Sequence, residues 1–511
     1  MHDLVMKPPN GPAGNLELQC DPVFVGETLD GPGTLCVQAA VRFRRVAATA
    51  AVRARALGRP VLAWLMLPVS PVDLVTLFDR ATQVADTRTL WEAPSERFGL
   101  VGIGSAWTVT TAGANRFAHA AETWRTVMDQ ACGDDSTGGG RISGPVGFGG
   151  FAFAPEPPTG GEWLGYPAGL LVLPRVSLVN IRDAGWLTVA AMIAPDGLAV
   201  DQDREVQACV RVYAEVLAGG AAGSGNQPEA ADRSTEEFPS AHAWRSLVAV
   251  TTDTIRAGAL QKVVLARGLR LRAAGFDPVG ALRTVRLEYP DCTLFAVARG
   301  RRCFLGATPE RLVRLHHGEM QVTALAGSVR RGASEDEDRR LGETLLRDPK
   351  DLTEHAIVVD ALRETLSAVC ARVSVPAGPV LLKMRNIQHL MTPMSGLPRE
   401  GTTLLDLVGR LHPTPAVGGA PREAALQWIR SHEGWDRGWY AGPVGWVDRT
   451  GNGEFAVAIR SAVVSGADAR LFAGCGIMAA SDPDREYAES SLKLRPVLSA
   501  LGVRGQEESG R

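Results

Sequence analysis

Apolar and polar residues follow two different periods along this chain, which predicts a mixture of strands and helices. In the first part of the chain, short apolar stretches rich in branched and aromatic residues predict strands at 58–67, 100–110, 145–154 and 169–181. Apolar residues three and four positions apart predict helices over 115–132 and 201–219. Neither period dominates, so this part is expected to combine both kinds of element.

The pattern is sharper after residue 240. Apolar residues with helical spacing predict helices at 243–258, 277–288, 349–373, 422–433 and 483–501. Between them, groups of adjacent strands are predicted at 261–271, 293–298, 302–307, 311–315, 320–328, 379–384, 443–448, 454–464 and 470–478. Groups of neighbouring strands separated by helices predict an α+β fold, with large antiparallel sheets packed together and helices outside.

One internal stretch lacks both periods. Residues 218–240, AGGAAGSGNQPEAADRSTEEFPS, are rich in Gly, Ala, Ser and acidic side chains, which is typical of a linker or surface loop. It separates a predicted N-terminal α/β half, 1–217, from a second half, 241–502. Residues 503–511 are expected to form a disordered tail.

Composition narrows the class of protein. The 511 residues are 45% hydrophobic with a net charge of −2, so no basic field indicates nucleic acid or a membrane surface. No apolar run approaches the ~20 residues that span a bilayer, and the N-terminus lacks the apolar core of a secretory signal. The eight cysteines include no CxxC pair, so we expect reduced thiols in a cytoplasmic protein.

Lysine is rare in this chain. It supplies only five of the 54 basic residues, yet Lys262 stands at the start of the apolar stretch QKVVLARGLRL, 261–271. An arginine stays protonated at any ordinary pH, whereas a lysine can lose its proton if its surroundings lower its pKa from ~10.4. Lys262 is therefore a candidate for chemistry that needs an amine.

Carboxylates recur on two predicted helices. Glu486, Glu489 and Lys493 share one helix face, and Glu354 falls on the apolar stripe of another helix. A solvated salt-bridged face and a helix-start glutamate are the simpler interpretations. However, the strand before the last helix, RLFAGCGIM, is apolar with two glycines, as if the backbone approached another group closely. Three glutamates without clustered Cys or His would suit Mg²⁺.

A further carboxylate, Glu310, lies in FLGATPERLVRL, just after a predicted strand and a proline turn. Loops at strand ends often carry catalytic groups. A turn glutamate in water remains the alternative.

Together these motifs resemble the chorismate-utilising enzymes, which include isochorismate, salicylate, anthranilate and aminodeoxychorismate synthases. The resemblance covers roughly 240–502 and is carried by an ordered set: KVVLAR, FLGATPERLVRL, TALAGSVRRG, LLKMRNIQHLMTPMSG, LHPTPAVGGAPREAA, WYAGPVGWVDRTGNGEFAVAIRSA, FAGCGIMAASDPDREYAES and LKLRP. It implies one large fold of two structurally related halves, with chorismate as substrate and Mg²⁺ as cofactor.

The resemblance also implies roles for individual residues. Glu354, Glu486 and Glu489 look like the magnesium ligands, and Glu310 looks like the general acid. The remaining matched positions look like substrate contacts: Ser328, His389, Tyr440, Arg460, Gly474, Gly476 and Lys493. The chain departs from the family pattern at Thr353 and Cys475, and the latter could alter substrate affinity.

Two features favour one reaction within the family. Members that deliver water resemble this chain in having Lys262, which would act as the base, and HPTPAVGG, 412–419, is similar to isochorismate synthases. We therefore expect an isomerase that adds water at C2 of chorismate and releases the C4 hydroxyl. A salicylate synthase and a non-catalytic chorismate-binding protein are the alternatives. The resemblance further implies a monomer without a glutaminase subunit, and a product used for menaquinone, siderophores or salicylate.

Overall fold

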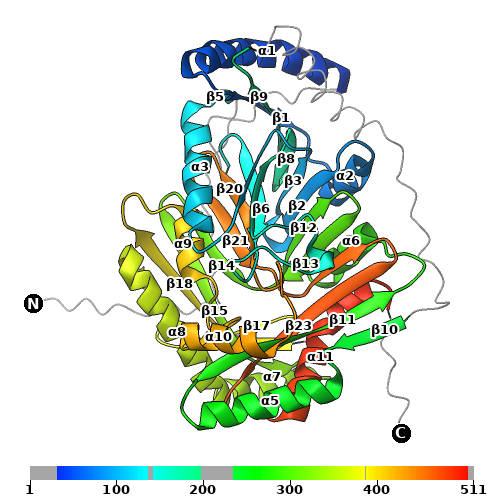
Figure 1. Cartoon of the computed structure of the whole chain (residues 1–511), viewed down its shortest axis with the longest axis vertical. Coiled ribbons are helices and arrows are strands. Elements are labelled where there is room, and N and C mark those ends of the chain that lie inside the picture. Colours follow the sequence, from blue (N-terminus) through cyan, green and yellow to red (C-terminus); the bar gives the residue numbers. More distant parts are fainter. Residues whose placement is uncertain (1–31, 136–141, 197–233, 386, 504–511) are drawn as a thin grey trace, which may run out of the picture.

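Two large β-sheets build the molecule, and helices cover their outer faces (Figure 1). The computed structural model describes residues 32–135, 142–196, 234–385 and 387–503. Antiparallel pairing dominates both sheets, as predicted from the sequence.

The larger sheet has 13 strands. Among its described pairings, β1–β5 is parallel and the others are antiparallel. In spatial order its strands are β10 (Ser234–Phe238), β11 (Lys262–Arg272), β23 (Asp468–Ile477), β22 (Ser461–Ser465), β13 (Arg302–Thr308), β12 (Thr293–Arg299), β2 (Thr87–Ala93), β3 (Phe98–Ile103), β8 (Val176–Ile181), β9 (Ala184–Ile193), β1 (Val61–Val69) and β5 (Cys132–Asp135), with β19 (Gly419–Ala420) pairing with β11.

The smaller sheet has 10 strands, and all of its described pairings are antiparallel. Its spatial order is β16 (Cys370–Ser374), β18 (Ile387–Pro398), β15 (Glu319–Arg330), β14 (Arg311–His316), β21 (Gly453–Val457), β20 (Pro443–Asp448), β6 (Val146–Phe151), β7 (Gly169–Leu173) and β4 (Trp107–Thr111), with β17 (Val380–Lys383) pairing with β18.

The two halves of the chain share both sheets. Strand β12 pairs with β2 in the larger sheet, and β20 pairs with β6 in the smaller one. The stretch 218–240 is described only from residue 234 onward, where strand β10 pairs with β11. The predicted helix 201–219 and nearly all of the predicted tail 503–511 lie outside the described residues.

Three stretches predicted as single strands each divide into two strands that belong to different sheets. Residues 100–110 contribute to β3 and β4, 169–181 to β7 and β8, and 454–464 to β21 and β22. Two of the breaks coincide with a residue in a left-handed conformation that an extended strand cannot contain: Gly104 has a φ of +69° and Arg460 a φ of +52°. Each break is a point where the chain crosses from one sheet to the other.

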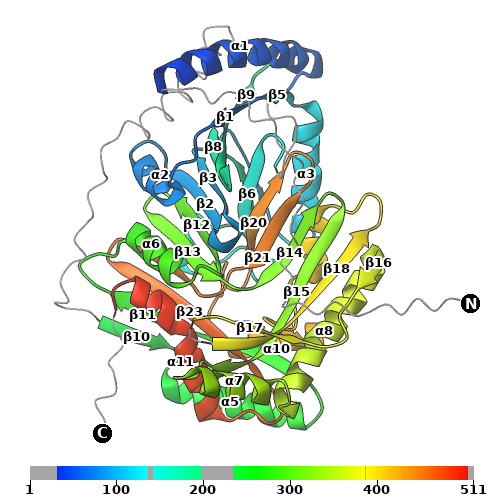
Figure 2. The same cartoon turned by 180° about the vertical axis from the view of Figure 1, so that it is seen from behind.

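Helices lie mainly on the outside, and the reverse view shows α8 and α11 at the lower end of the molecule (Figure 2). Both begin in the same way, with an aspartate N-cap followed by proline: Asp348–Pro349 in α8 and Asp482–Pro483 in α11. The helices are α1 (Pro32–Leu57), α2 (Leu74–Arg80), α3 (Arg116–Gln130), α5 (Ala241–Arg256), α6 (Pro278–Glu288), α7 (Glu335–Leu345), α8 (Pro349–Val369), α9 (Leu404–Leu411), α10 (Arg422–His432) and α11 (Pro483–Ala500), with short 3₁₀ turns η1 (Ala81–Gln83), η2 (Pro94–Glu96) and η3 (Gly161–Trp163).

The core is divided into two layers. Aromatic side chains from both sheets, such as Trp91 and Phe148 in edge-to-face contact at 6.3 Å, fill one layer. A second cluster packs the larger sheet against α1, α2, α6 and α11. Over the described residues, no helix is both long and apolar enough to cross a membrane. Five cysteines with described side chains are buried free thiols.

Candidate active site

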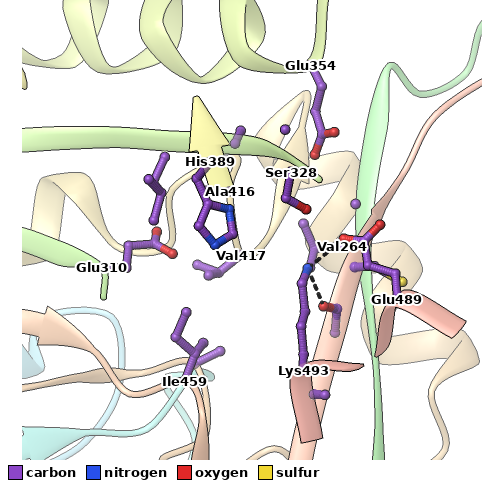
Figure 3. A pocket seen from close by; sticks show the side chains of 18 of the residues that line it. Val264, Glu310, Ser328, Glu354, His389, Ala416, Val417, Ile459, Glu489 and Lys493 are labelled. Atoms are coloured by element: carbon purple, nitrogen blue, oxygen red, sulfur yellow. Dashed lines mark hydrogen bonds and ion pairs between the residues drawn. The ribbon is translucent and has the colours of Figure 1, made fainter. Parts of the chain in front are cut away.

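A pocket lies where the chain crosses between the two sheets, and it collects nearly all residues that the sequence pointed to. Figure 3 shows Glu310 entering from one side and Glu354 and Glu489 from the other, with His389 and Ser328 between them. The predicted site residues in its wall are Lys262, Glu310, Ser328, Glu354, His389, Tyr440, Arg460, Gly474, Gly476, Glu489 and Lys493. Glu486 is not part of this wall.

Glu310 occupies the crossover between β13 and β14. Its backbone carbonyl accepts a hydrogen bond of 3.0 Å from Val457 N, which fixes it against the neighbouring crossover between β21 and β22. The side chain is buried, and its carboxyl has no hydrogen-bond partner among the described residues. Burial raises the pKa of Glu310 to about 7, and the positive charges of Lys262, Lys493 and Arg460 oppose that shift. Glu310 can therefore carry a proton near neutral pH.

Arg460 occupies that neighbouring crossover. Its carbonyl accepts a 3.2 Å hydrogen bond from Ala307 N, and its left-handed backbone conformation is one that a non-glycine residue seldom adopts. The guanidinium is buried and pairs with no described side chain, and burial lowers its pKa below the ordinary value. A buried cation without a partner is a prepared site for an anion.

Lys262 is the first residue of β11 and its side chain is only 1% exposed. Its Nζ lies 2.8 Å from Oε1 of Glu354 on α8. Gly476 makes this approach possible, because a Cβ there would stand 2.5 Å from Glu354 Oε1 and 2.7 Å from Lys262 Cε. The glycine is therefore required by the side chains around it.

Lys493 and Glu489 form an ion pair one turn apart on α11, with Nζ and Oε1 separated by 2.8 Å. Lys493 Nζ also donates to the Gly474 carbonyl at 3.1 Å. Burial acts to lower the pKa of Lys493, but the Glu489 carboxylate outweighs it, so this pKa lies above its ordinary value. Lys493 therefore remains a cation in the pocket wall.

Glu486 is 2% exposed and is held by two groups. Ser481 Oγ donates to Oε1 at 2.6 Å, and Lys350 Nζ lies 3.4 Å from the same oxygen. Burial and the nearby Glu489 carboxylate raise the pKa of Glu486. The thiol of Cys475, one of the departures noted above, donates to the Glu486 backbone carbonyl at 3.5 Å.

His389 faces Ser328 across a bulge in β15. Gly327 within the bulge has a φ of +80°, and its carbonyl accepts a hydrogen bond from the imidazole ring. Burial, followed by the charges of Arg460 and Lys493, lowers the pKa of His389 well below its ordinary value, so the ring is neutral. Its Nε2 has no partner within the described residues, which leaves an acceptor available to a ligand.

Tyr440 also lines the pocket. Its ring stacks on Phe472 with centroids 5.1 Å apart, and a Cβ at Gly474 would lie 3.1 Å from its hydroxyl oxygen. Burial raises the pKa of Tyr440, so its hydroxyl stays protonated and can donate a hydrogen bond.

Three charged residues of the wall, Lys350, Asp351 and Arg437, were not among those selected from the sequence. Lys350 and Asp351 begin α8, and burial together with the Glu354 carboxylate raises the pKa of Asp351 to about 6. Arg437 is buried and pairs with Glu433, and it donates to the carbonyls of Val264 at 2.7 Å and Val417 at 3.1 Å. The i,i+4 spacing of Glu433 and Arg437 was the only available signal for this pair.

The Glu433–Arg437 pair is expected to stabilise the fold strongly. Arg437→Met would leave a buried carboxylate without its cation and two carbonyls without donors, so the free energy of unfolding should fall by about 3–5 kcal/mol. Urea unfolding measures this change. Arg363→Met removes the exposed Arg363–Asp360 pair and should cost less than about 1 kcal/mol. Equal costs for the two variants would contradict the buried pair's role.

The fold and this site define the class of protein. The chain belongs to the chorismate-binding enzymes, since the family model described as "Chorismate binding enzyme" matches residues 47–502. It is 35% identical over 470 residues to isochorismate synthase MenF of Bacillus subtilis, covering 90% of this chain and 98% of that protein. It is 36% identical to the salicylate biosynthesis isochorismate synthase of Pseudomonas aeruginosa, covering 88% and 93% of the two chains.

Solved structures agree with the fold. The menaquinone-specific isochorismate synthase MenF from Escherichia coli superposes with a TM-score of 0.72 at 25% identity, covering 89% of this chain and 100% of that chain. Anthranilate synthase component I from Streptococcus pneumoniae shares the fold with a TM-score of 0.64 at 20% identity, covering 78% and 92%. The predicted family and sheet architecture are thereby confirmed.

Proposed function

We propose that this protein is an isochorismate synthase, which converts chorismate to isochorismate by adding water at ring C2 and releasing the C4 hydroxyl. One observation carries this proposal: the same pocket contains the amine of Lys262, at the start of β11, and the carboxyl of Glu310. Burial raises the pKa of Glu310 to about 7. Water addition needs a base for the incoming oxygen and an acid for the departing one.

Lys262 is assigned as the base and Glu310 as the acid. Water loses a proton to the Lys262 amine as its oxygen bonds to C2. The ring double bonds shift, and the C4 oxygen leaves with the proton of Glu310. A glutamate at its ordinary pKa of ~4.3 would hold almost no proton at neutral pH, so burial of Glu310 is what makes it an acid there.

The charges of the pocket suit a substrate with two carboxylates. Arg460 supplies a buried guanidinium without a partner, and Lys493 supplies a second cation. His389 Nε2 can accept a hydrogen bond from a ring hydroxyl, and Tyr440 can donate one. These groups would orient chorismate so that C2 and C4 meet the base and the acid.

A magnesium ion fits the carboxylate side of the pocket. Glu354 and Glu489 point into it, whereas Glu486 is not part of the pocket wall, so the first two would hold the ion and Glu486 would act through water. In the described part of the chain, no three acidic, imidazole or thiol groups stand close enough to form a complete ligand set. Mg²⁺ needs only one or two carboxylates with waters and substrate oxygens. When bound, it would neutralise the ring carboxylate and polarise the conjugated ring.

The product assay tests this function. Purified protein incubated with chorismate and Mg²⁺ should form isochorismate, measured by liquid chromatography, without salicylate or pyruvate. Treatment with EDTA should abolish turnover, and added Mg²⁺ should restore it.

Each other result has a definite meaning. Release of salicylate and pyruvate would identify a salicylate synthase. Chorismate binding without turnover would identify a binding protein. Turnover unaffected by exhaustive EDTA treatment would refute the metal assignment while leaving the acid–base assignment standing.

A further inference from the structure

The glutamates of the proposed metal site are each paired with a lysine. Lys262 lies 2.8 Å from Glu354, Lys350 lies 3.4 Å from Glu486, and Lys493 lies 2.8 Å from Glu489. Three of the five lysines in the chain are used in this way. Rare lysines placed one to one on the same three carboxylates indicate that the cluster is balanced by ammonium groups when no metal is bound.

Lys350 differs from its two counterparts. Lys262 is assigned to the chemistry and Lys493 to the substrate, whereas nothing in the reaction requires Lys350. Its pair has the longest separation of the three, and its side chain is 40% exposed, compared with 1% for Lys262 and 21% for Lys493. The Lys350 side chain can therefore move into solvent at low cost, and the other two cannot.

The backbone of Lys350 is fixed while its side chain is free to leave. Its N–H donates to Oδ1 of the N-cap Asp348 at 2.9 Å, which anchors it in the first turn of α8. Side-chain motion would therefore leave the helix start, and with it Glu354, in place. This is the arrangement expected of a displaceable group on a rigid element.

The Lys350 ammonium and a bound divalent cation would compete for the same carboxylates. The carboxylates of Glu486, Glu354 and Glu489 all act on the Lys350 ammonium, and Asp351 adds a fourth acid close by. Without a counter-ion, these like charges would repel one another in a partly buried site. A divalent cation on Glu354 and Glu489 would supply the same compensation and would repel the ammonium at this short range.

We propose that Lys350 is an internal counter-ion that holds the glutamate cluster together in the metal-free protein and must withdraw when Mg²⁺ binds, so that it sets the affinity for the metal. This inference rests on the magnesium site of the proposed function. It makes Lys350 a positioning residue and not a catalytic one.

Calorimetric titration of Mg²⁺ into the metal-stripped protein, without chorismate, tests the proposal. Lys350→Met should bind Mg²⁺ about five to ten times more tightly than the wild type, because a competitor worth about 1 kcal/mol is removed. Lys350→Arg keeps the charge and should bind no more tightly than the wild type. Lys383→Met is the matched control, since Lys383 is 44% exposed and pairs at 3.0 Å with the buried Asp338, which lies outside the pocket wall.

Melting temperatures give a second readout. In EDTA, Lys350→Met should melt below the wild type, and saturating Mg²⁺ should close the gap. The deficit of Lys383→Met should be the same with and without Mg²⁺. A merely structural role for Lys350 would lower the melting temperature and leave the metal affinity unchanged.

The outcomes separate the two proposals. If the wild type binds Mg²⁺ and Lys350→Met binds it equally or more weakly, the counter-ion role is overturned and the metal site stands. If neither protein binds Mg²⁺, the metal site is refuted and the counter-ion role with it. Tighter binding by Lys350→Met alone among the variants supports both.

Discussion

Lys262→Ala should lower kcat for isochorismate formation by about a hundredfold to ten-thousandfold, the usual contribution of a positioned general base. The residue is buried at the start of β11, where its amine is shielded from bulk water. Chorismate binding should persist, because Arg460 and Lys493 remain to hold its carboxylates. Steady-state kinetics with a separate measurement of chorismate Kd distinguishes the two effects.

Lys262→Arg is the sharper variant. A guanidinium keeps the positive charge facing Glu354 but cannot release a proton near neutral pH. We therefore expect it to be nearly as inactive as Lys262→Ala. An arginine variant with more than about a tenth of the wild-type kcat would show that Lys262 acts through its charge and would remove it as the base.

Glu310→Gln should also lower kcat by about a hundredfold to ten-thousandfold, because the amide fills the same space without donating a proton to the leaving hydroxyl. The variant should fold normally, since the Glu310 carboxyl has no hydrogen-bond partner in the described structure and its backbone bond to Val457 is unaffected. Glu319→Gln, an exposed glutamate on β15, is a control that should retain full activity.

The pH dependence of the wild type adds an independent check. As the proposed acid, Glu310 would act only when protonated, and burial raises its pKa to about 7. The protonated fraction is therefore full below that pH and is lost as pH rises through it, so the contribution of Glu310 to kcat/KM should decline above about pH 7. A kcat/KM that is constant from pH 6 to pH 9 would contradict the assignment of Glu310 as the acid.

Sequence patterns were sufficient to select pocket residues whose setting follows from their own neighbours in the chain. Lys262 stood out at the head of an apolar strand, and Glu310 stood out after a strand and a proline turn; both lie in the pocket wall. The helices predicted from 349 and 483 do begin at Pro349 and Pro483, and Glu354 and Glu489 lie within their first two turns. Antiparallel sheets were likewise predictable from groups of adjacent strands.

Other features depend on partners that are distant in sequence. Nothing local distinguishes Lys350 from a surface lysine, because its partner Glu486 is 136 residues away on another helix. Arg437 reaches Val264 and Val417 only because three segments fold together. The apolar pattern of 454–464 also could not predict that the chain changes sheets at Arg460. That change depends on which distant strands the two parts pair with: β14 before Arg460 and β13 after it.

The exchange of strands between the two halves has a consequence for synthesis on the ribosome. Strand β6 is complete at Phe151, but its partner β20 begins only at Pro443, roughly 290 residues later. Because translation proceeds at ~5–20 residues per second, this edge of β6 remains unpaired for on the order of tens of seconds before β20 is synthesised. Strand β2 waits similarly for β12. These two apolar edges are therefore the places where a nascent chain is most exposed to premature association, and where a chaperone would have most to protect.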